Sequence, residues 1–300
     1  MTERRAVLVM AYGTPHDLGG VEAYYTDIRG GRPPPPERLD DLIARYRAIG
    51  GSPLRAITNA QVRGIEQRAG VPCHLGQKHA EPFIPDAVEQ LARDEVERSV
   101  GLVLAPHYST VSIGDYEARA RRAAGEIGWD GNLRMVESWH LEAGYLDFLT
   151  AAVGRAISTL SERAQAGAVV IFTAHSLPAR AVRAGDPYRR QLTETADAVA
   201  RRAGLDRWQI GWQSAGRTTD PWLGPDVTES ITELSGKGVP GIVVCPCGFV
   251  ADHLEVLYDI DIEARAVAEK QSIELARTDM PNDDPNFLDT LARVVERAFR

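Results

Sequence analysis

The sequence predicts an α/β protein of two domains, each a parallel β-sheet flanked by helices. Four short apolar runs have the composition of buried parallel strands, and turn residues and a helical pattern follow each of them. The runs fall into two pairs, one in each half of a 300-residue chain that is long enough for two domains. The runs are AVLVMAYG (6–13), GLVLAPHYS (101–109), AVVIFTAHS (168–176) and GIVVCPCGF (241–249).

Three weaker apolar runs are further strand candidates. We expect an N-terminal domain over 1–145, a C-terminal domain over 146–283 and a terminal helix over 284–300. The last segment has an apolar face at helical spacing, so we expect it to pack back on the body. The weaker candidates are 71–78, 133–139 and 207–214, and the apolar face of the terminal helix holds Phe287, Leu288, Leu291, Val294 and Val295.

Two loops have unusual composition. The segment GGRPPPPERLDD (30–41) holds four consecutive prolines, which predicts a stiff, extended connector and no helix. The segment SAGRTTDPWLGPDV (214–227) is long and rich in glycine and proline, and loops of this kind often line a site.

Composition excludes several function classes. A formal net charge of −8 lacks the basic footprint of a nucleic-acid binder, so we expect no nucleic-acid partner. No apolar run approaches the roughly 18 residues of a membrane span, and the first residues show no signal-peptide pattern, so we expect no integral membrane protein. The three cysteines make no disulfide framework, and we expect a reduced, cytoplasmic setting.

An acidic row lies near the C-terminal end, in DHLEVLYDIDIE (252–263). Glu255, Asp259 and Glu263 are four residues apart, so on a helix they share one face, where like charges repel by roughly 0.2–0.5 kcal/mol per pair. A solvated helix face explains such a row, and Asp252 could also cap the helix. The other hypothesis is a path for a divalent metal, because carboxylates bind hard cations.

Two histidines close predicted strands, and parallel strands present their carboxyl ends at one edge. His175 and His107 could each serve as a base or metal ligand there, or as a hydrogen-bonded structural histidine. His79 is expected to be structural or to lie at the rim. The common nucleotide-binding and hydrolase signatures, such as G-x-G-x-x-G and G-x-S-x-G, do not follow any strand.

Six segments, in this order along nearly the whole chain, resemble the ferrochelatase family. The resemblance implies two Rossmann-like domains of the chelatase type around a porphyrin cleft. It also implies insertion of Fe²⁺ into a porphyrin with release of two protons. The segments are LVMAYGTP, RYRAIGGSPL, LAPHYST, TAHSLP, GWQSAGRTTDPWLGPDV and GFVADHLEVLYDIDIE.

The resemblance divides the acidic row. It implies that His175 and Glu255 bind Fe²⁺ and remove the pyrrole protons, since these residues match the family's invariant His and Glu. Asp259 and Glu263 match an outer, secondary metal site, with Asp261 nearby, and His253 and Asp252 fall to a turn or supporting role. In the family this helix is partly of the π type.

The resemblance also implies a substrate. The polar stretch after the first strand is similar to that of bacterial ferrochelatases that act on coproporphyrin III in haem b biosynthesis. Gly30 and Gly31 stand where those enzymes tend to be basic, and the GGSP turn is one residue shorter than in relatives. By the same resemblance, Tyr12 would reach iron from the opposite face, Arg29 and Arg45 would pair with propionates, and Tyr46, Ser52 and Tyr116 would line the porphyrin.

The resemblance further sets the expected cofactors and partners. Some ferrochelatases hold a [2Fe–2S] cluster on four cysteines, whereas this chain has Cys73, Cys245 and Cys247 alone, so we expect no cluster and no cofactor beyond substrate Fe²⁺. We expect the protein to be a monomer. Its expected partners are the porphyrin, ferrous iron and, transiently, other enzymes of the porphyrin pathway. The alternatives are a protoporphyrin IX ferrochelatase, a sirohydrochlorin cobalt chelatase and a non-catalytic tetrapyrrole carrier or haem sensor.

Overall fold

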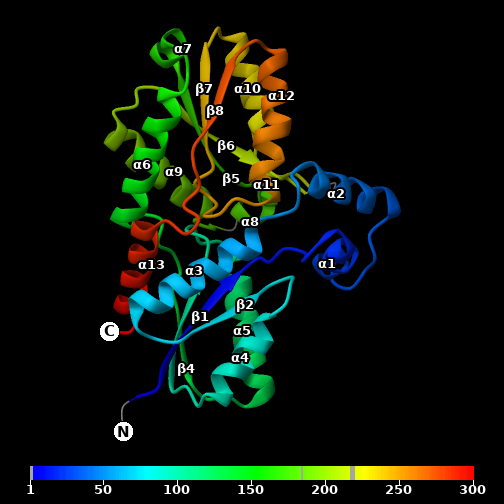
Figure 1. Ribbon diagram of the computed structural model, residues 1–300, viewed down its shortest axis with the longest axis vertical. Helices are drawn as coiled ribbons and strands as arrows, with labels where there is room; N and C mark the ends of the chain where they lie inside the picture. Colours follow the sequence, from blue (N-terminus) through cyan, green and yellow to red (C-terminus); the bar gives the residue numbers. More distant parts are fainter. Residues whose placement is uncertain (1–2, 184, 217–219) are drawn as a thin grey trace.

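The computed structural model of the protein describes residues 3–183, 185–216 and 220–300 and contains two parallel four-stranded sheets. The first has the order β2-β1-β3-β4 and the second the order β6-β5-β7-β8, so the strands of both follow the same sequence of positions. Figure 1 shows the sheets one above the other along the long axis. The strands are β1 Arg5–Ala11, β2 Cys73–Gln77, β3 Arg98–Val103, β4 Asn132–Met135, β5 Val169–His175, β6 Trp208–Gln213, β7 Gly241–Cys245 and β8 Glu274–Arg277.

This architecture confirms the predicted fold class. Each of the seven predicted strand segments overlaps a strand, although β1 and β4 begin one residue earlier and β3 three residues earlier than predicted. The sequence did not reveal β8, because its four residues Glu-Leu-Ala-Arg form no apolar run and only Ala276 among them is buried.

Helices cover both faces of each sheet. Figure 1 shows α4 and α5 against the first sheet and α6, α9, α10 and α12 around the second. The helices are α1 Val21–Ile28, α2 Pro36–Ala48, α3 Leu54–Ala69, α4 Ile84–Arg93, α5 Ile113–Ile127, α6 Ala143–Ser158, α7 Glu162–Gly167, α8 Ala179–Arg183, α9 Tyr188–Ala203, α10 Val227–Gly236, α11 Leu254–Leu257, α12 Arg265–Lys270 and α13 Pro285–Ala298, with a 3₁₀ turn η1 at Leu18–Gly20 and a π-helix η2 at Asp259–Ala264.

Alternation along the strands divides the core into three parts. Val7 and Val9 of β1 pack in one large cluster that also takes in Val170 and Phe172 of β5, so a shared core joins the two halves. The intervening residues of each strand point the other way, because successive side chains alternate across a strand. In β1 these are Ala6, Leu8 and Met10, which pack under α4 and α5, and in β5 Val169 and Ile171 pack under α10 and η2.

The terminal helix α13 packs back on the body, against α3 and α6. Its predicted apolar face is buried, and Phe287 lies against Trp139 and Tyr145 with ring centroids 5.8 and 6.1 Å apart. The domain boundary at 145/146 stays a prediction, and α6 runs across it.

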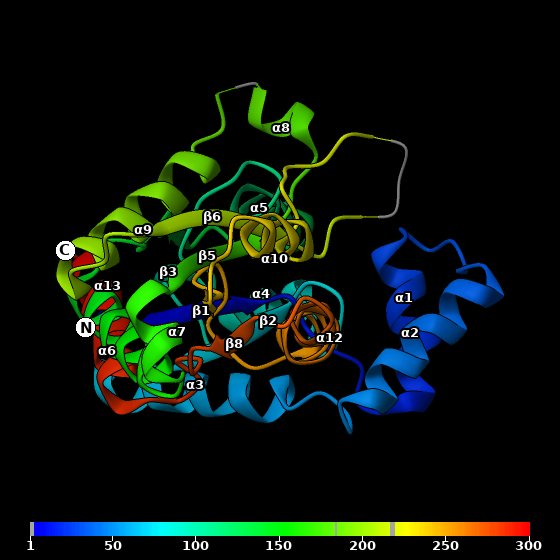
Figure 2. The same cartoon turned by 90° about the horizontal axis from the view of Figure 1, so that it is seen from above.

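The expectation for the proline-rich segment is wrong in part. Residues 36–41 belong to α2, which begins at Pro36. A proline fits the first helical turn, because its missing N–H would have no partner there and its φ is already helical. Figure 2 shows α1 and α2 set apart from the sheets as an arm that follows β1.

Two further sequence expectations concern loops and membranes. Residues 217–219 of the predicted site loop 214–227 lie outside the described residues. Within the described part of the chain, the helices are too short or too polar for any of them to cross a membrane.

Candidate active site

His175 is the last residue of β5, and the segment that follows β7 crosses close beside it. Gly248 makes this crossing possible, because a Cβ there would lie 2.3 Å from Cβ of Ala174. The Gly248 amide donates to the Thr173 carbonyl at 2.9 Å. Because β5 and β7 are neighbours in the sheet, the chain after β7 returns over the end of β5 and carries Glu255 toward His175.

Glu255 lies in the first turn of α11 with its carboxylate between two histidines. Its Oε1 is 3.4 Å from His175 Nε2, and its Oε2 is 3.6 Å from His253 Nε2. The Gln213 side-chain amide at the end of β6 donates to the Glu255 carbonyl at 2.9 Å. Three adjacent strands of the second sheet therefore supply or hold this group of residues.

The hydrogen bond of His175 selects its reactive nitrogen. Nδ1 lies 2.6 Å from the Ser176 carbonyl, which only accepts, so Nδ1 carries a proton and Nε2 faces Glu255. Burial lowers the pKa of His175, but the Glu255 charge and hydrogen bond outweigh it and raise that pKa to about 9. Burial raises the pKa of Glu255, and the two histidines more than reverse this, so its pKa falls well below the usual range. At neutral pH the pair is an imidazolium beside a carboxylate.

Asp259 and Glu263 share a face as predicted, and Arg45, which is distant in the sequence, neutralises both carboxylates. Arg45 of α2 lies 3.6 Å from Asp259 and 3.5 Å from Glu263, and its guanidinium stacks over the Tyr258 ring at 4.6 Å. Burial, then the charge of Glu255, raises the pKa of Asp259 to about 7. The expected π geometry is present, since the Glu263 amide donates to the Tyr258 carbonyl at 3.0 Å.

A second arginine neutralises the remaining acids of this segment. Arg277 of β8 donates to both carboxylate oxygens of Asp261 at 2.8 and 3.0 Å and lies 3.2 Å from Asp252. The Asp252 amide donates to Asn282 Oδ1, and the Asn282 side-chain amide donates to Asp252 Oδ2, both at 2.8 Å, which fits the supporting role expected of Asp252 at the turn. The sequence alone did not identify Arg277, because this residue lies on β8, the described strand that no apolar run had predicted.

The first half contributes tyrosines. Tyr12 follows β1 directly, is 44% exposed, and packs edge-on against His79 with ring centroids 4.7 Å apart. The His79 ring is buried, and its Nδ1 lies 2.6 Å from Asp27 Oδ2. Tyr46 and Tyr116 are both buried, Tyr46 with its hydroxyl 3.4 Å from that of Thr14.

The remaining predicted porphyrin contacts lie around the arm. Arg29 ends α1 and stacks over the Tyr25 ring at 5.9 Å. The Ser52 hydroxyl accepts a hydrogen bond from the Leu54 amide at 3.3 Å, just before α3. The structure thus places Arg29, Arg45 and Tyr46 on the arm.

His107 is structural, although it closes its strand run as His175 does. It is buried, and its Nε2 is 2.9 Å from the Thr195 hydroxyl of α9. Burial lowers its pKa well below the usual value, so the ring is neutral. The hypothesis of a second strand-end base or ligand at this position is therefore wrong.

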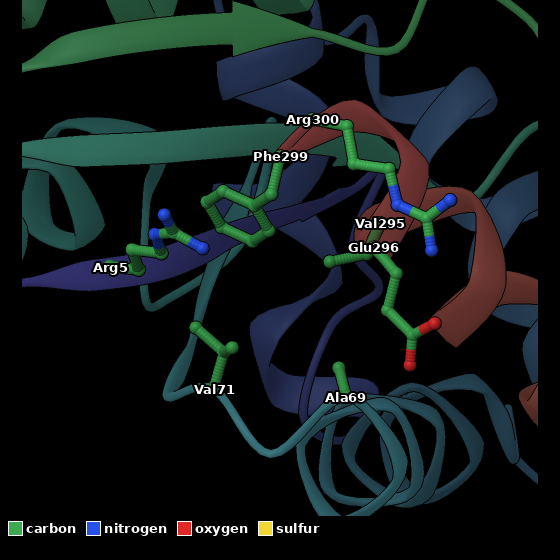
Figure 3. Close-up of a pocket in the computed structure, with 7 residues that line it drawn as sticks. All are labelled: Arg5, Ala69, Val71, Val295, Glu296, Phe299 and Arg300. Carbon is green, nitrogen blue, oxygen red and sulfur yellow. The ribbon is translucent and has the colours of Figure 1, made fainter.

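A surface pocket of about 230 Å³ lies elsewhere, between the start of β1 and the end of α13 (Figure 3). Arg5 opens β1, whereas Tyr12 follows its end, so this pocket lies at the opposite edge of the sheet from Tyr12. Its lining residues are Arg5, Ala69, Val71, Val295, Glu296, Phe299 and Arg300.

Comparison with known proteins identifies the family. The model of the family "Ferrochelatase" matches residues 4–299. The chain belongs to the ferrochelatase family. Among its relatives, the coproporphyrin III ferrochelatase of Geobacillus thermodenitrificans is 48% identical over 298 residues, which cover 96% of this chain and 94% of that protein. The coproporphyrin III ferrochelatase of Anoxybacillus flavithermus is 47% identical over 303 residues, 98% of this chain and 96% of that protein.

Solved structures agree with the fold that the ferrochelatase family implies. The sirohydrochlorin chelatase SirB from Bacillus subtilis in complex with cobalt aligns with a TM-score of 0.60 over 98% of this chain and 95% of that chain. SirB with Fe³⁺ aligns with a TM-score of 0.64 and the same coverage. Sequence identities of 11% and 12% show a common fold and nothing more.

Proposed function

We propose that this ferrochelatase is a lyase that inserts Fe²⁺ into coproporphyrin III and gives Fe-coproporphyrin III for haem b biosynthesis. The observation that supports it most directly is the 3.4 Å approach of His175 Nε2 to Glu255 Oε1 at the carboxyl end of the second sheet. The names of relatives up to 48% identical favour coproporphyrin III as the porphyrin. The proposal includes a cytoplasmic setting.

The pair His175–Glu255 has the chemistry that metal insertion needs. Insertion forms four iron–nitrogen bonds and releases two pyrrole protons. Nε2 of His175 can hold either a proton or Fe²⁺, so the proton that Glu255 stabilises there must leave before the imidazole ligates iron or accepts a pyrrole proton. Glu255 keeps its charge throughout and compensates whichever cation is present.

The second carboxylate group serves as an outer station in this proposal. Asp259 and Glu263 lie one and two turns beyond Glu255 and share one counter-ion, Arg45. Hard divalent cations suit oxygen ligands, so Fe²⁺ arriving at these carboxylates competes with a guanidinium.

We assign the first half to the porphyrin. Tyr12 reaches iron from the face opposite His175, and Tyr46, Ser52 and Tyr116 complete the lining. Arg29 and Arg45 pair with propionates, and Arg45 then exchanges its contacts with Asp259 and Glu263 for a propionate. Two faces of one macrocycle are then held by residues from two sheets. We further propose that the protein works as a monomer, that it carries no [2Fe–2S] cluster, and that it meets other porphyrin-pathway enzymes transiently.

The test is anaerobic metal insertion with Fe²⁺ and either coproporphyrin III or protoporphyrin IX. The loss of free-porphyrin fluorescence measures the rate. We expect faster turnover of coproporphyrin III. Equal or faster turnover of protoporphyrin IX would move the assignment to that substrate. Tight binding of the iron porphyrin without insertion would instead identify a carrier.

A further inference from the structure

Asp186 joins the two halves of the molecule through one carboxylate. Its Oδ2 accepts hydrogen bonds from the Ser109 hydroxyl at 2.9 Å and the Thr110 amide at 2.7 Å, both in the loop that follows β3. Its Oδ1 accepts from the Tyr188 amide at 3.0 Å, at the start of α9. Asp186 therefore fixes the first turn of a second-half helix to a first-half loop.

Two later turns of α9 hold the same loop. The Gln191 side-chain oxygen accepts from the Tyr108 amide at 2.6 Å, and the Thr195 hydroxyl lies 2.9 Å from His107 Nε2. Asp186, two residues before α9, and Gln191 and Thr195 on α9 thus contact the four consecutive residues 107–110. Since Thr195 and His107 are buried, this junction is protected from competition by water.

Tyr188 extends the junction to the candidate active site. Its hydroxyl donates to the His175 carbonyl at 3.1 Å, and its ring is 6% exposed. The ring packs between Trp212 and His107, with centroids 5.8 and 6.2 Å away. The side chain of His175 follows its backbone closely, because its Nδ1 is bound to the carbonyl of the next residue, Ser176.

We propose that Asp186 and Tyr188 are positioning residues that set the place of His175 relative to the Tyr12-bearing half. The inference rests on the proposed function, in which the macrocycle lies between Tyr12 and His175. These two residues belong to different sheets, so their separation depends on how the sheets are joined. Insertion requires close alignment of Nε2 with the macrocycle centre, and misplacement of a reacting group by about 1 Å can cost about a hundredfold in rate.

Tyr188→Phe is the primary test, because it removes one hydroxyl and keeps the buried ring. We expect kcat for iron insertion to fall about tenfold, with KM for coproporphyrin III unchanged, because the hydroxyl contacts a carbonyl and not the porphyrin. We also expect the imidazole resonances of His175 to shift in long-range ¹H–¹⁵N spectra. The matched control is Asp197→Asn on the same helix, which removes only a surface pairing with Arg201 and should leave both readouts as in the wild type.

Asp186→Asn is the second variant, because the amide keeps the shape and loses acceptor capacity and charge. We expect the same direction in both readouts, and less than additive losses in the double variant, because both changes act through one path. Unchanged kcat, or a fall in kcat that follows lost thermal stability with unshifted His175 resonances, overturns the proposal. If the wild-type protein inserts no iron, the proposed function fails, and the resonances of His175 alone then decide the positioning role.

Discussion

The two halves of the molecule have the same strand order but place different chemistry at equivalent points. The strand that comes first in the chain in each half leads to a candidate site residue: Tyr12 follows β1, and His175 ends β5. After the third strand the halves diverge. The chain beyond β3 brings His107 into the junction with α9, whereas the chain beyond β7 brings Glu255 to His175. The two sheets therefore offer equivalent edges at the carboxyl ends of their strands, and the loops that follow the strands determine which edge carries ionisable groups.

The electrostatics sharpen this difference. The second half gathers Glu255, Asp259 and Glu263 on one helical face, and the balancing cation Arg45 comes from the arm of the first half. In the first half, Tyr46 and Tyr116 are buried, and burial keeps Tyr46 protonated, with a pKa raised to about 12. In the proposed function, the first half holds the macrocycle and the second half handles the cations.

The largest expected effect is on kcat for iron insertion and distinguishes His175 from Tyr12. His175→Ala should lower kcat for iron insertion by about 10³-fold, because it removes the imidazole at the end of β5 whose Nε2 lies 3.4 Å from Glu255. Tyr12→Phe keeps the ring and should cost less than about tenfold. Steady-state insertion kinetics measure both, and equal losses would contradict the division between the halves.

The next comparison lies within the acidic row. Glu255→Gln should lower kcat about a hundredfold, because the neutral amide cannot compensate a cation at His175. Glu263→Gln should leave kcat close to wild type and raise the Fe²⁺ concentration needed for half-maximal rate. Initial rates across an Fe²⁺ series distinguish the two, and indistinguishable variants would show that the row is one site.

The Gly248 crossing gives a prediction about stability. Gly248→Ala should destabilise the fold by about 1–3 kcal/mol, because the new methyl group overlaps Ala174 and must push the segment that carries Glu255. Gly236→Ala is the control, since a Cβ at Gly236 meets nothing within 4 Å. Urea unfolding of both variants measures the difference, and equal midpoints would mean that the crossing relaxes freely.

The smallest effect is a pH shift. The pKa of His175 is raised to about 9, so its contribution to stability is complete below the unfolded-state value near 6.5 and is lost as pH rises through 9. Glu255→Gln removes the main cause and should move the titration of the His175 imidazole to lower pH. An NMR titration follows it, and a midpoint that stays in place would show that Glu255 does not set this pKa.

Much of the fold followed from local pattern. Among the residues that the structure describes, apolar runs predicted seven of the eight strands, and the remaining strand, β8, is too short and too exposed to form such a run. The proline-rich segment was predicted to be an extended connector, and this was wrong for its second half, because Pro36 begins helix α2. His107 and His175 had the same local sequence signal, and only their partners distinguish a buried structural histidine from one beside a carboxylate.

The sequence by itself determined the α/β class, the doubled strand pattern and the acidic row, since each depends on residue type and spacing along one segment. Only the tertiary structure determined which side chains from different segments contact one another. It brought Arg45 to Asp259 and Glu263 across more than 200 residues, Arg277 to Asp261, and Asp186 to the loop after β3. Such pairings depend on the folding of distant segments to one place, and no spacing within a segment encodes them.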